Sequence, residues 1–327
     1  MFFLNLLILA AGFVALIKGA DIFVDGSAAL ARVFRVPAMI IGLTIVAMGT
    51  SAPELAVSTV AAIEGANEIA FSNVVGSNIF NLLMVLGLCA VIRPVPVNRT
   101  ILWHDYPVAF IPTAAVFLLM GGLKLFGGGL LRMDMNAVAG TVTRPVALTL
   151  LAVFAIYLFL LARSAQKNRR KEEDSFGFKY STRKCVLLIL AGIALIVAGG
   201  QAVVYSAKEI ARALGMTETL IALTVVSVGT SLPELVTSLV AARKEETELA
   251  VGNVIGSNIF NLMMILGVSA AIHPVTVNVA SVWDLLILLF VTAETWLFAL
   301  LGKKINRPEG ILMVVSYAAV VAFAIIR

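Results

Sequence analysis

The sequence predicts an all-α integral membrane protein whose ten transmembrane helices form two five-helix repeats of inverted topology. Three observations lead to this fold class. The chain of 327 residues is 61% hydrophobic, it contains ten long apolar runs, and it carries an internal repeat at an offset of 180 residues. Soluble chains are roughly 45–50% apolar, so this chain has more apolar surface than a water-soluble fold can bury. The composition excludes a soluble enzyme, a disordered protein and a nucleic-acid-binding protein.

Ten segments are long enough to cross a bilayer, since a spanning helix needs about 20 mostly apolar residues. The first segment lacks the cationic start of a signal peptide, so we expect it to be retained as a helix. The predicted spans are 2–31, 37–63, 69–92, 102–122, 138–162, 185–211, 217–241, 248–271, 282–301 and 308–326.

The net charge of +5 is concentrated in one loop, because residues 163–184 alone carry a net charge of +5. Loops on the same side of the predicted membrane hold 17 cationic residues, and loops on the other side hold six. Cytoplasmic loops are enriched in Lys and Arg. We therefore predict a multi-pass protein of the cytoplasmic (inner) membrane, with this loop in the cytoplasm and both termini outside it.

The repeat has no gap: residues 37–98 align with 217–278, and 34 of the 62 positions are identical. Its strongest matches are polar. They are Gly-Thr-Ser-Ala-Pro-Glu at 49–54 with Gly-Thr-Ser-Leu-Pro-Glu at 229–234, and Gly-Ser-Asn-Ile-Phe-Asn at both 76–81 and 256–261.

The repeat also predicts the organisation of the chain. We expect a first five-helix repeat at 1–163, a basic cytoplasmic linker at 164–184 and a second five-helix repeat at 185–327. Because each repeat contains an odd number of spans, the second copy must be inverted in the membrane. Inverted repeats are typical of transporters, with the substrate site near the midplane where the repeats meet.

Two glutamates, Glu54 and Glu234, lie in the middle of predicted spans. A charged residue at that depth costs about 2.5–3.5 kcal/mol on insertion scales. Pro53 and Pro233 precede them, and each proline deprives the carbonyl four residues earlier of its helical partner. Freed backbone oxygens are tolerated in a membrane only when they are buried in protein or line a cavity. The alternative is that each glutamate is protonated, or pairs with a basic residue, as a contact between helices.

Two carboxylates and several freed carbonyls suit a hard cation such as Ca²⁺, which takes six to eight oxygen ligands. With no Cys or His in these blocks, zinc and soft metals are disfavoured. Polar side chains spaced four apart share a helix face beside the broken helices. These are Asn73, Ser77 and Asn81, with repeat mates Asn253, Ser257 and Asn261. For Ser77, Asn81 and their mates we favour a role as cation ligands over ordinary hydrogen bonding between helices. We assign Asn78 and Asn258, which lie off this face, to ordinary hydrogen bonding.

No HExxH, GxSxG or P-loop pattern occurs in the sequence, so hydrolysis and ATP coupling have no support. We expect no enzymatic activity, no cofactor, and no ATP or nucleic acid as a partner. A driven transporter without an ATP site must be a secondary transporter.

Further charged residues in the spans are not assigned to the site. Lys18 and Asp21, three residues apart, are expected to pair with each other. Glu294 has no acidic mate in the repeat and is not assigned to the site.

The paired blocks GTSxPE and GSNIFN, repeated across ten spans, resemble the α-repeats of the sodium/calcium exchangers. These belong to the Ca²⁺/cation antiporter superfamily, and the prokaryotic membrane exchangers are the most similar. The resemblance covers nearly the whole chain. It implies alternating access, with Ca²⁺ and several Na⁺ competing for one central site. The transported ions and the lipid bilayer are then the expected partners.

On matching positions, the resemblance implies Ca²⁺ ligands from Glu54 and Glu234 and from the carbonyls of Thr50 and Thr230. It implies Na⁺ ligands from Ser51, Ser77, Ser231 and Ser257 and from the backbone oxygens of Ala47 and Ser227, and Asn81 completes the site residues of the first half. Asn261 departs from the family pattern, since several members have Asp there, which leaves the Na⁺ count and any proton coupling open. Two alternatives remain: a Ca²⁺/H⁺ antiporter of the same fold and a passive cation channel.

Overall fold

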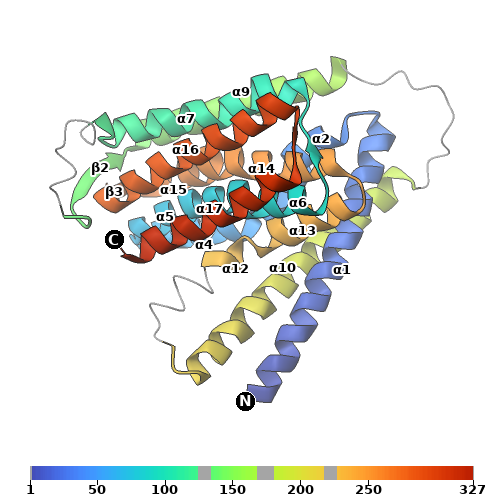
Figure 1. Cartoon of the computed structure of the whole chain (residues 1–327), viewed down its shortest axis with the longest axis horizontal. Coiled ribbons are helices and arrows are strands. Elements are labelled where there is room, and N and C mark those ends of the chain that lie inside the picture. Colours follow the sequence, from blue (N-terminus) through green and yellow to red (C-terminus); the bar gives the residue numbers. More distant parts are fainter. Residues whose placement is uncertain (1, 124–133, 168–179, 217–226, 327) are drawn as a thin grey trace. The chain divides into compact units, whose positions relative to one another are not determined.

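The computed structural model describes residues 2–123, 134–167, 180–216 and 227–326. Within them, eight helices are long and apolar enough to cross a membrane, or nine if the bent pair Ala38–Thr50 and Ala52–Ile63 is one span. The chain is therefore a mostly helical, multi-pass membrane protein (Figure 1). The predicted span 217–241 begins at 217–226, outside the described residues, so the number ten stays a prediction.

The helices match the predicted apolar runs closely; those labelled η are π-helical. In the first half they are α1 (Phe2–Phe34), α2 (Ala38–Ile41), η1 (Gly42–Val46), α3 (Ala47–Thr50), α4 (Ala52–Ile63), α5 (Asn67–Phe80), η2 (Asn81–Val85), α6 (Leu86–Ile92), η3 (Ile101–Asp105), α7 (Tyr106–Leu119) and α9 (Arg144–Lys167). In the second half they are α10 (Thr182–Ala213), α12 (Ser227–Thr230), α13 (Leu232–Arg243), α14 (Thr247–Ile259), η6 (Phe260–Ile265), α15 (Leu266–Ile272), α16 (Val279–Gly302) and α17 (Arg307–Ile326).

Among the residues that the structure describes, four short strands interrupt the helical pattern. Strand β1 (Val95–Pro96) pairs with β4 (Lys304–Ile305), and β2 (Val138–Val142) pairs with β3 (Val275–Asn278), both antiparallel. The prediction of a fifth span beginning at 138 was therefore wrong at its start. Residues 138–142 satisfy their backbone groups by pairing with β3, and Pro145 suits the first turn of α9 because that position needs no N–H.

Helical structure extends into both ends of the segment 164–184. Helix α9 continues to Lys167 and α10 begins at Thr182. The Ser181 side chain caps α10 by accepting a hydrogen bond from the Lys184 N–H at 3.4 Å, as serine commonly does at this position. Residues 168–179, which hold much of the predicted basic linker, lie outside the described residues.

The chain packs as two compact units, and each unit combines parts of both halves of the sequence. Unit 1 comprises Met1–Pro53 and Leu160–Gly256, and unit 2 comprises Glu54–Phe159 and Ser257–Arg327. Two of the boundaries fall inside the repeated blocks, directly before Glu54 and directly before Ser257.

In unit 1, α1 and α10 lie side by side and run antiparallel (Figure 1). A Cβ added to Gly12 would lie 3.0 Å from the Gly199 carbonyl oxygen, and one added to Gly19 would lie 3.0 Å from the Gly192 carbonyl oxygen. The absent side chains let the two backbones approach closely. Gly192 follows Gly12 by 180 residues and Gly199 follows Gly19 by 180. Exchanging the two halves of the sequence therefore leaves this pair of contacts unchanged.

In unit 2, two glycines related by the repeat each pack against a long helix from the other half of the sequence. A Cβ on Gly87 in α6 would lie 3.0 Å from the Gly310 carbonyl oxygen in α17. A Cβ on its mate, Gly267 in α15, would lie 2.9 Å from the Leu151 Cγ in α9. The repeat-related helices α6 and α15 therefore each pack against the last long helix of the other half, α17 and α9 respectively.

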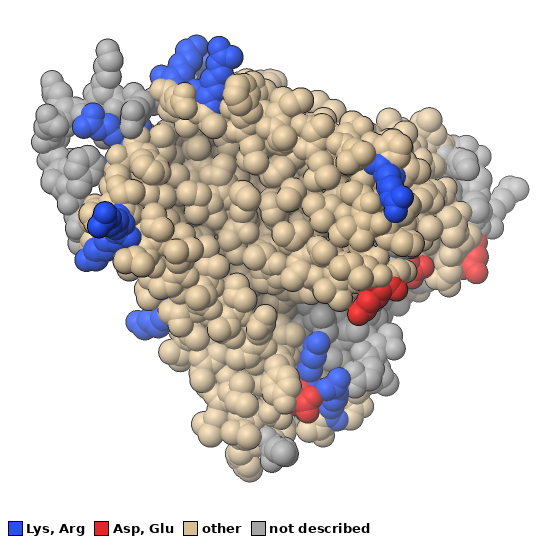
Figure 2. All heavy atoms as spheres, turned by 180° about the vertical axis from the view of Figure 1, so that it is seen from behind, with Lys and Arg blue, Asp and Glu red and all other residues tan. Residues whose placement is uncertain are grey.

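Large apolar side chains are exposed along the long helices, for example Leu187 (67%), Phe290 (68%) and Leu301 (77%). On the face drawn in Figure 2, the Lys, Arg, Asp and Glu side chains are confined mainly to the margins of a broad uncharged surface. Such a surface is unfavourable in water and suits a lipid environment.

The close packing of α1 on α10 predicts opposite effects for two adjacent glycines. A Cβ on Gly199 would meet the Leu16 N at 2.7 Å and the Gly12 carbonyl oxygen at 2.8 Å, whereas the nearest atoms to a Cβ on Gly200 lie at 3.8 Å. We expect Gly199→Ala to destabilise the fold by about 1–3 kcal/mol through overpacking. The matched control Gly200→Ala should be neutral or slightly stabilising, since alanine favours helices. Melting temperatures of the purified protein in detergent test this, and equal values for the two variants would contradict it.

Candidate cation-binding site

Both repeated GTSxPE blocks contain a helix break, as the prolines predict. Ser51 separates α3 from α4 with φ −82° and ψ 10°, and the helices before and after it are bent by 49°. Ser231 separates α12 from α13 with φ −90° and ψ 7°. Pro53 and Pro233 lie in the first turn of the following helix, where a missing N–H removes no helical hydrogen bond.

In unit 1, residues of the first block contact residues of the second half. The Ser51 hydroxyl donates to Glu234 Oε1 at 2.6 Å. The Thr50 hydroxyl donates to Asn253 Oδ1 at 3.0 Å, and Asn253 Nδ2 donates to Ser238 Oγ at 2.9 Å. All five side chains are buried. A carboxylate, hydroxyls and a carboxamide are therefore collected around the break at Ser51, which is the oxygen-rich chemistry that a hard cation requires.

In unit 2, Glu54 is fully buried in the first turn of α4. Asn73 Nδ2 donates to the Glu54 carbonyl oxygen at 3.2 Å and to Ser58 Oγ at 2.8 Å. The Ser58 carbonyl also accepts the Ser269 hydroxyl at 3.2 Å. The contact between Asn73 and Ser58 is the repeat mate of the one between Asn253 and Ser238. Each glutamate-bearing helix is therefore tied to the following helix by the same Asn–Ser hydrogen bond.

A cluster of four buried asparagines lies at the second repeated block, also in unit 2. Asn78 Nδ2 donates to the Asn258 carbonyl, and Asn258 Nδ2 donates to the Asn78 carbonyl, both at 3.2 Å. Asn261 Nδ2 donates to Asn78 Oδ1 at 3.1 Å. Asn81 begins the π-helical turn η2, and neither its Oδ1 nor its Nδ2 has a hydrogen-bond partner within the described part of the chain. π-Helical turns are frequent at functional sites.

The remaining predicted ligands lie in the same blocks or, for Ala47 and Ser227, two residues before them. Ser77, Thr230, Ser231 and Ser257 are buried. The Ala47 carbonyl accepts the Ser51 N–H at 3.0 Å and the Thr50 hydroxyl at 3.3 Å. Ser227 is the first residue of α12, and its side chain lies outside the described residues. Their roles as ion ligands stay predictions.

Sequence reasoning missed several partners in these clusters. Ser58 and Ser238 hold Asn73 and Asn253, and the identity of the two serines in the repeat is a signal that could have identified them. The expected pairing of Asp21 with Lys18 is replaced by one with Lys244, whose Nζ lies 3.4 Å from Asp21 Oδ1. That partner lies in the turn after α13, which a spacing rule within one helix cannot find.

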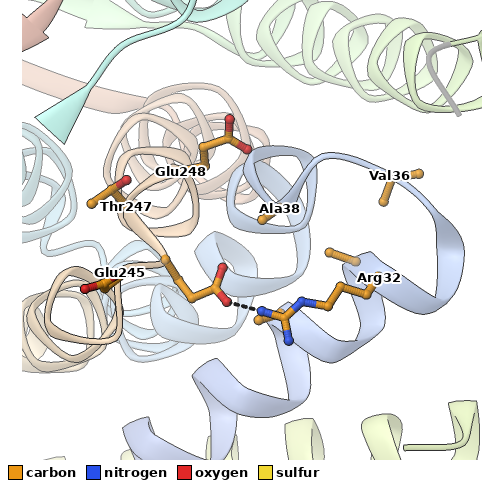
Figure 3. A pocket seen from close by; sticks show the side chains of 9 residues that line it. Arg32, Val36, Ala38, Glu245, Thr247 and Glu248 are labelled. Atoms are coloured by element: carbon orange, nitrogen blue, oxygen red, sulfur yellow. Dashed lines mark hydrogen bonds and ion pairs between the residues drawn. The ribbon is translucent and has the colours of Figure 1, made fainter. Parts of the chain in front are cut away.

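A separate pocket of about 280 Å³ lies in unit 1 at the C-terminal end of α1. Two of its lining residues, Arg32 and Glu246, form an ion pair, which is the dashed line at Arg32 in Figure 3. It contains none of the predicted ligands. The structure groups no three His, Cys, Asp or Glu side chains as a metal site among the residues it describes. A cation at the buried blocks would therefore depend on hydroxyl, carboxamide and carbonyl oxygens besides single carboxylates.

The chain is similar to known exchangers and antiporters over nearly its whole length. The family model for the sodium/calcium exchanger protein matches residues 4–163 and 184–326. The putative antiporter CaxA of Alkalimonas amylolytica is 35% identical over 94% of both chains. The sodium/calcium exchanger MaX1 of Methanosarcina acetivorans is 32% identical over 98% of both.

Among solved structures, the sodium-calcium exchanger NCX_Mj soaked with 10 mM Na⁺ and zero Ca²⁺ has a TM-score of 0.82 at 31% identity. That match covers 98% of this chain and 99% of the other. The helical fold, the buried glutamates in the repeated blocks and the match to the family model all lead to the same assignment. The chain belongs to the sodium/calcium exchanger family, as a prokaryotic member of the Ca²⁺/cation antiporters.

Proposed function

We propose that this protein is a secondary active antiporter that exchanges Na⁺ for Ca²⁺ across the cytoplasmic membrane. The observation that carries the proposal is the buried Glu234 carboxylate, which accepts a hydrogen bond from Ser51 of the other repeated block. Buried charge of this kind is rare in membrane proteins and marks ion pathways. The name of the relative MaX1, a sodium/calcium exchanger, supports Na⁺ as the counter-ion.

The proposed Ca²⁺ ligands are Glu54 and Glu234 with the carbonyls of Thr50 and Thr230. Two ionised carboxylates balance the charge of one Ca²⁺, and carbonyl oxygens help to complete its coordination shell. The proposed Na⁺ ligands offer mostly neutral oxygens; they are Ser51, Ser77, Ser231, Ser257, Asn81, Asn261 and the backbone of Ala47 and Ser227.

We further propose that the two halves are inverted-topology repeats. Three observations support this arrangement: the antiparallel course of α1 and α10, the exchangeable glycine contacts along them, and the reciprocal bonds between Asn78 and Asn258. In the glycine contacts and in the Asn78–Asn258 bonds, residues 180 apart make each other's contacts, as a two-fold relation requires. Such repeats permit alternating access around a fixed central site.

The proposed orientation has the basic segment 163–184 in the cytoplasm and both termini outside. The excess of Lys and Arg on the side of that segment supports it.

The proposed site also explains why transport would be coupled. Without a cation, two ionised carboxylates repel each other and lose hydration, so an occluded empty site is unfavourable. Binding of Ca²⁺ or of Na⁺ removes that penalty. The conformational change then proceeds mainly when the site is loaded, which is the condition for exchange.

The choice of counter-ion is tested with the wild-type protein in reconstituted vesicles. A Na⁺ gradient at fixed pH should drive Ca²⁺ uptake, whereas a pH gradient without Na⁺ should not. Uptake driven only by the pH gradient would favour the Ca²⁺/H⁺ antiporter. Ca²⁺ flux that persists without any counter-ion would favour a passive channel.

The two buried glutamates give the most direct mutational test. Glu54→Gln and Glu234→Gln each remove one negative charge at nearly constant volume, so the site can no longer balance Ca²⁺. We expect both to abolish Na⁺-driven Ca²⁺ uptake in reconstituted vesicles while the protein still folds.

Glu294→Gln is the matched control, because Glu294 is a partly buried glutamate in α16 outside the repeated blocks. It should transport normally. Normal transport by both Glu54→Gln and Glu234→Gln would refute the assignment of these residues.

A further inference from the structure

The four asparagines of the second repeated block form two pairs of repeat mates, Asn78 with Asn258 and Asn81 with Asn261. All four are buried, and all lie in unit 2. The first pair is symmetric, since each side chain donates to the other's backbone carbonyl at 3.2 Å. The second pair is not symmetric, because the Asn261 side chain donates a hydrogen bond and the Asn81 side chain has no partner among the described residues. Since the two residues are of the same type, the difference comes from the conformation.

The orientation of Asn261 follows from the backbone. Asn78 Nδ2 must donate to the Asn258 carbonyl, which can only accept. Asn78 Oδ1 is then left as an acceptor for Asn261 Nδ2, at 3.1 Å. This bond leaves Asn261 Oδ1 buried, and that oxygen has no hydrogen-bond partner within residues 2–123, 134–167, 180–216 and 227–326.

In the other half of the repeat, the hydrogen bond equivalent to the one from Asn261 to Asn78 would join Asn81 Nδ2 to Asn258 Oδ1. In this structure the two atoms are both buried, and neither has a hydrogen-bond partner among the described residues. Buried polar groups are nearly always paired, so a matched but unused donor and acceptor identify a contact that the same residues can make in another conformation.

We propose that Asn78 and Asn258 are positioning residues that alternately hold the two carboxamide ligands, Asn261 and Asn81. This inference rests on the proposed function and on the proposed inverted repeats. Because inverted repeats are related by a two-fold axis in the membrane plane, we expect an asymmetry between them in one state to be reversed in the opposite-facing state. Asn78 therefore orients Asn261 in the state described here, with its Oδ1 available to a cation. Asn258 orients Asn81 in the opposite-facing state.

Alternation predicts an effect that depends on the side of the membrane. Asn78→Ala removes the acceptor that holds Asn261, and Asn258→Ala removes the acceptor that holds Asn81. Each should raise the half-saturating Na⁺ concentration by about fivefold on one side only, which corresponds to the loss of about one net hydrogen bond. The affected sides should be opposite for the two variants.

The measurement is Na⁺-dependent Ca²⁺ exchange in reconstituted vesicles, with Na⁺ titrated separately from each side of a uniformly oriented population. Ser269→Ala is the control, because it also removes a buried hydrogen bond, to the Ser58 carbonyl at 3.2 Å, outside the asparagine cluster. It should show no side-specific shift. If the alanine variants do not fold, Asn78→Ser and Asn258→Ser serve instead, since serine keeps a donor but does not reach as far as the asparagine acceptor.

Shifts on opposite sides would support the inference. Shifts on the same side, equal shifts on both sides, or no shift for either variant would overturn it. Failure of the wild-type protein to exchange Na⁺ for Ca²⁺ would instead refute the proposed function, so the two failures are distinguishable.

Discussion

The burial of a carboxylate inside a membrane protein is the constraint on which the rest of this molecule depends. Glu54 and Glu234 are fully buried, and an ionised group at that depth is costly unless donors and cations compensate it. The helices are broken at Ser51 and at Ser231, and the Ser51 hydroxyl donates a hydrogen bond to the Glu234 carboxylate. The helix breaks, the hydrogen-bond donor at Ser51 and the proposed bound cations would each reduce the free-energy cost of burying the two carboxylates.

Duplication offers a simple way to build such a site. One repeat supplies one carboxylate, a broken helix and an asparagine-bearing neighbour, and a second copy doubles each of them. The same Asn–Ser hydrogen bond holds both glutamate helices, through Asn73 and Ser58 in one half and Asn253 and Ser238 in the other. Glycines along α1 and α10 let the first helices of the two halves pack closely without side chains in between.

The spans and the helix breaks were predictable because their causes are local: apolar runs of sufficient length, and a proline inside such a run, which favours the start of a new helix. Strand β2 was not, because its partner β3 lies more than 130 residues away and short apolar stretches suit either structure. The pairing of Asp21 with Lys244 likewise depends on tertiary packing. The difference between Asn81 and Asn261 is beyond any sequence argument, since the two residues are identical and only the conformation separates them.

Equilibrium Ca²⁺ binding to the purified protein in detergent measures whether Ca²⁺ and Na⁺ share one buried site. Radioactive Ca²⁺ is held near half saturation while Na⁺ is raised, with K⁺ replacing Na⁺ to hold ionic strength constant. If the two ions share one site, high Na⁺ should displace all of the bound Ca²⁺. Bound Ca²⁺ that remains unchanged at saturating Na⁺ would contradict it.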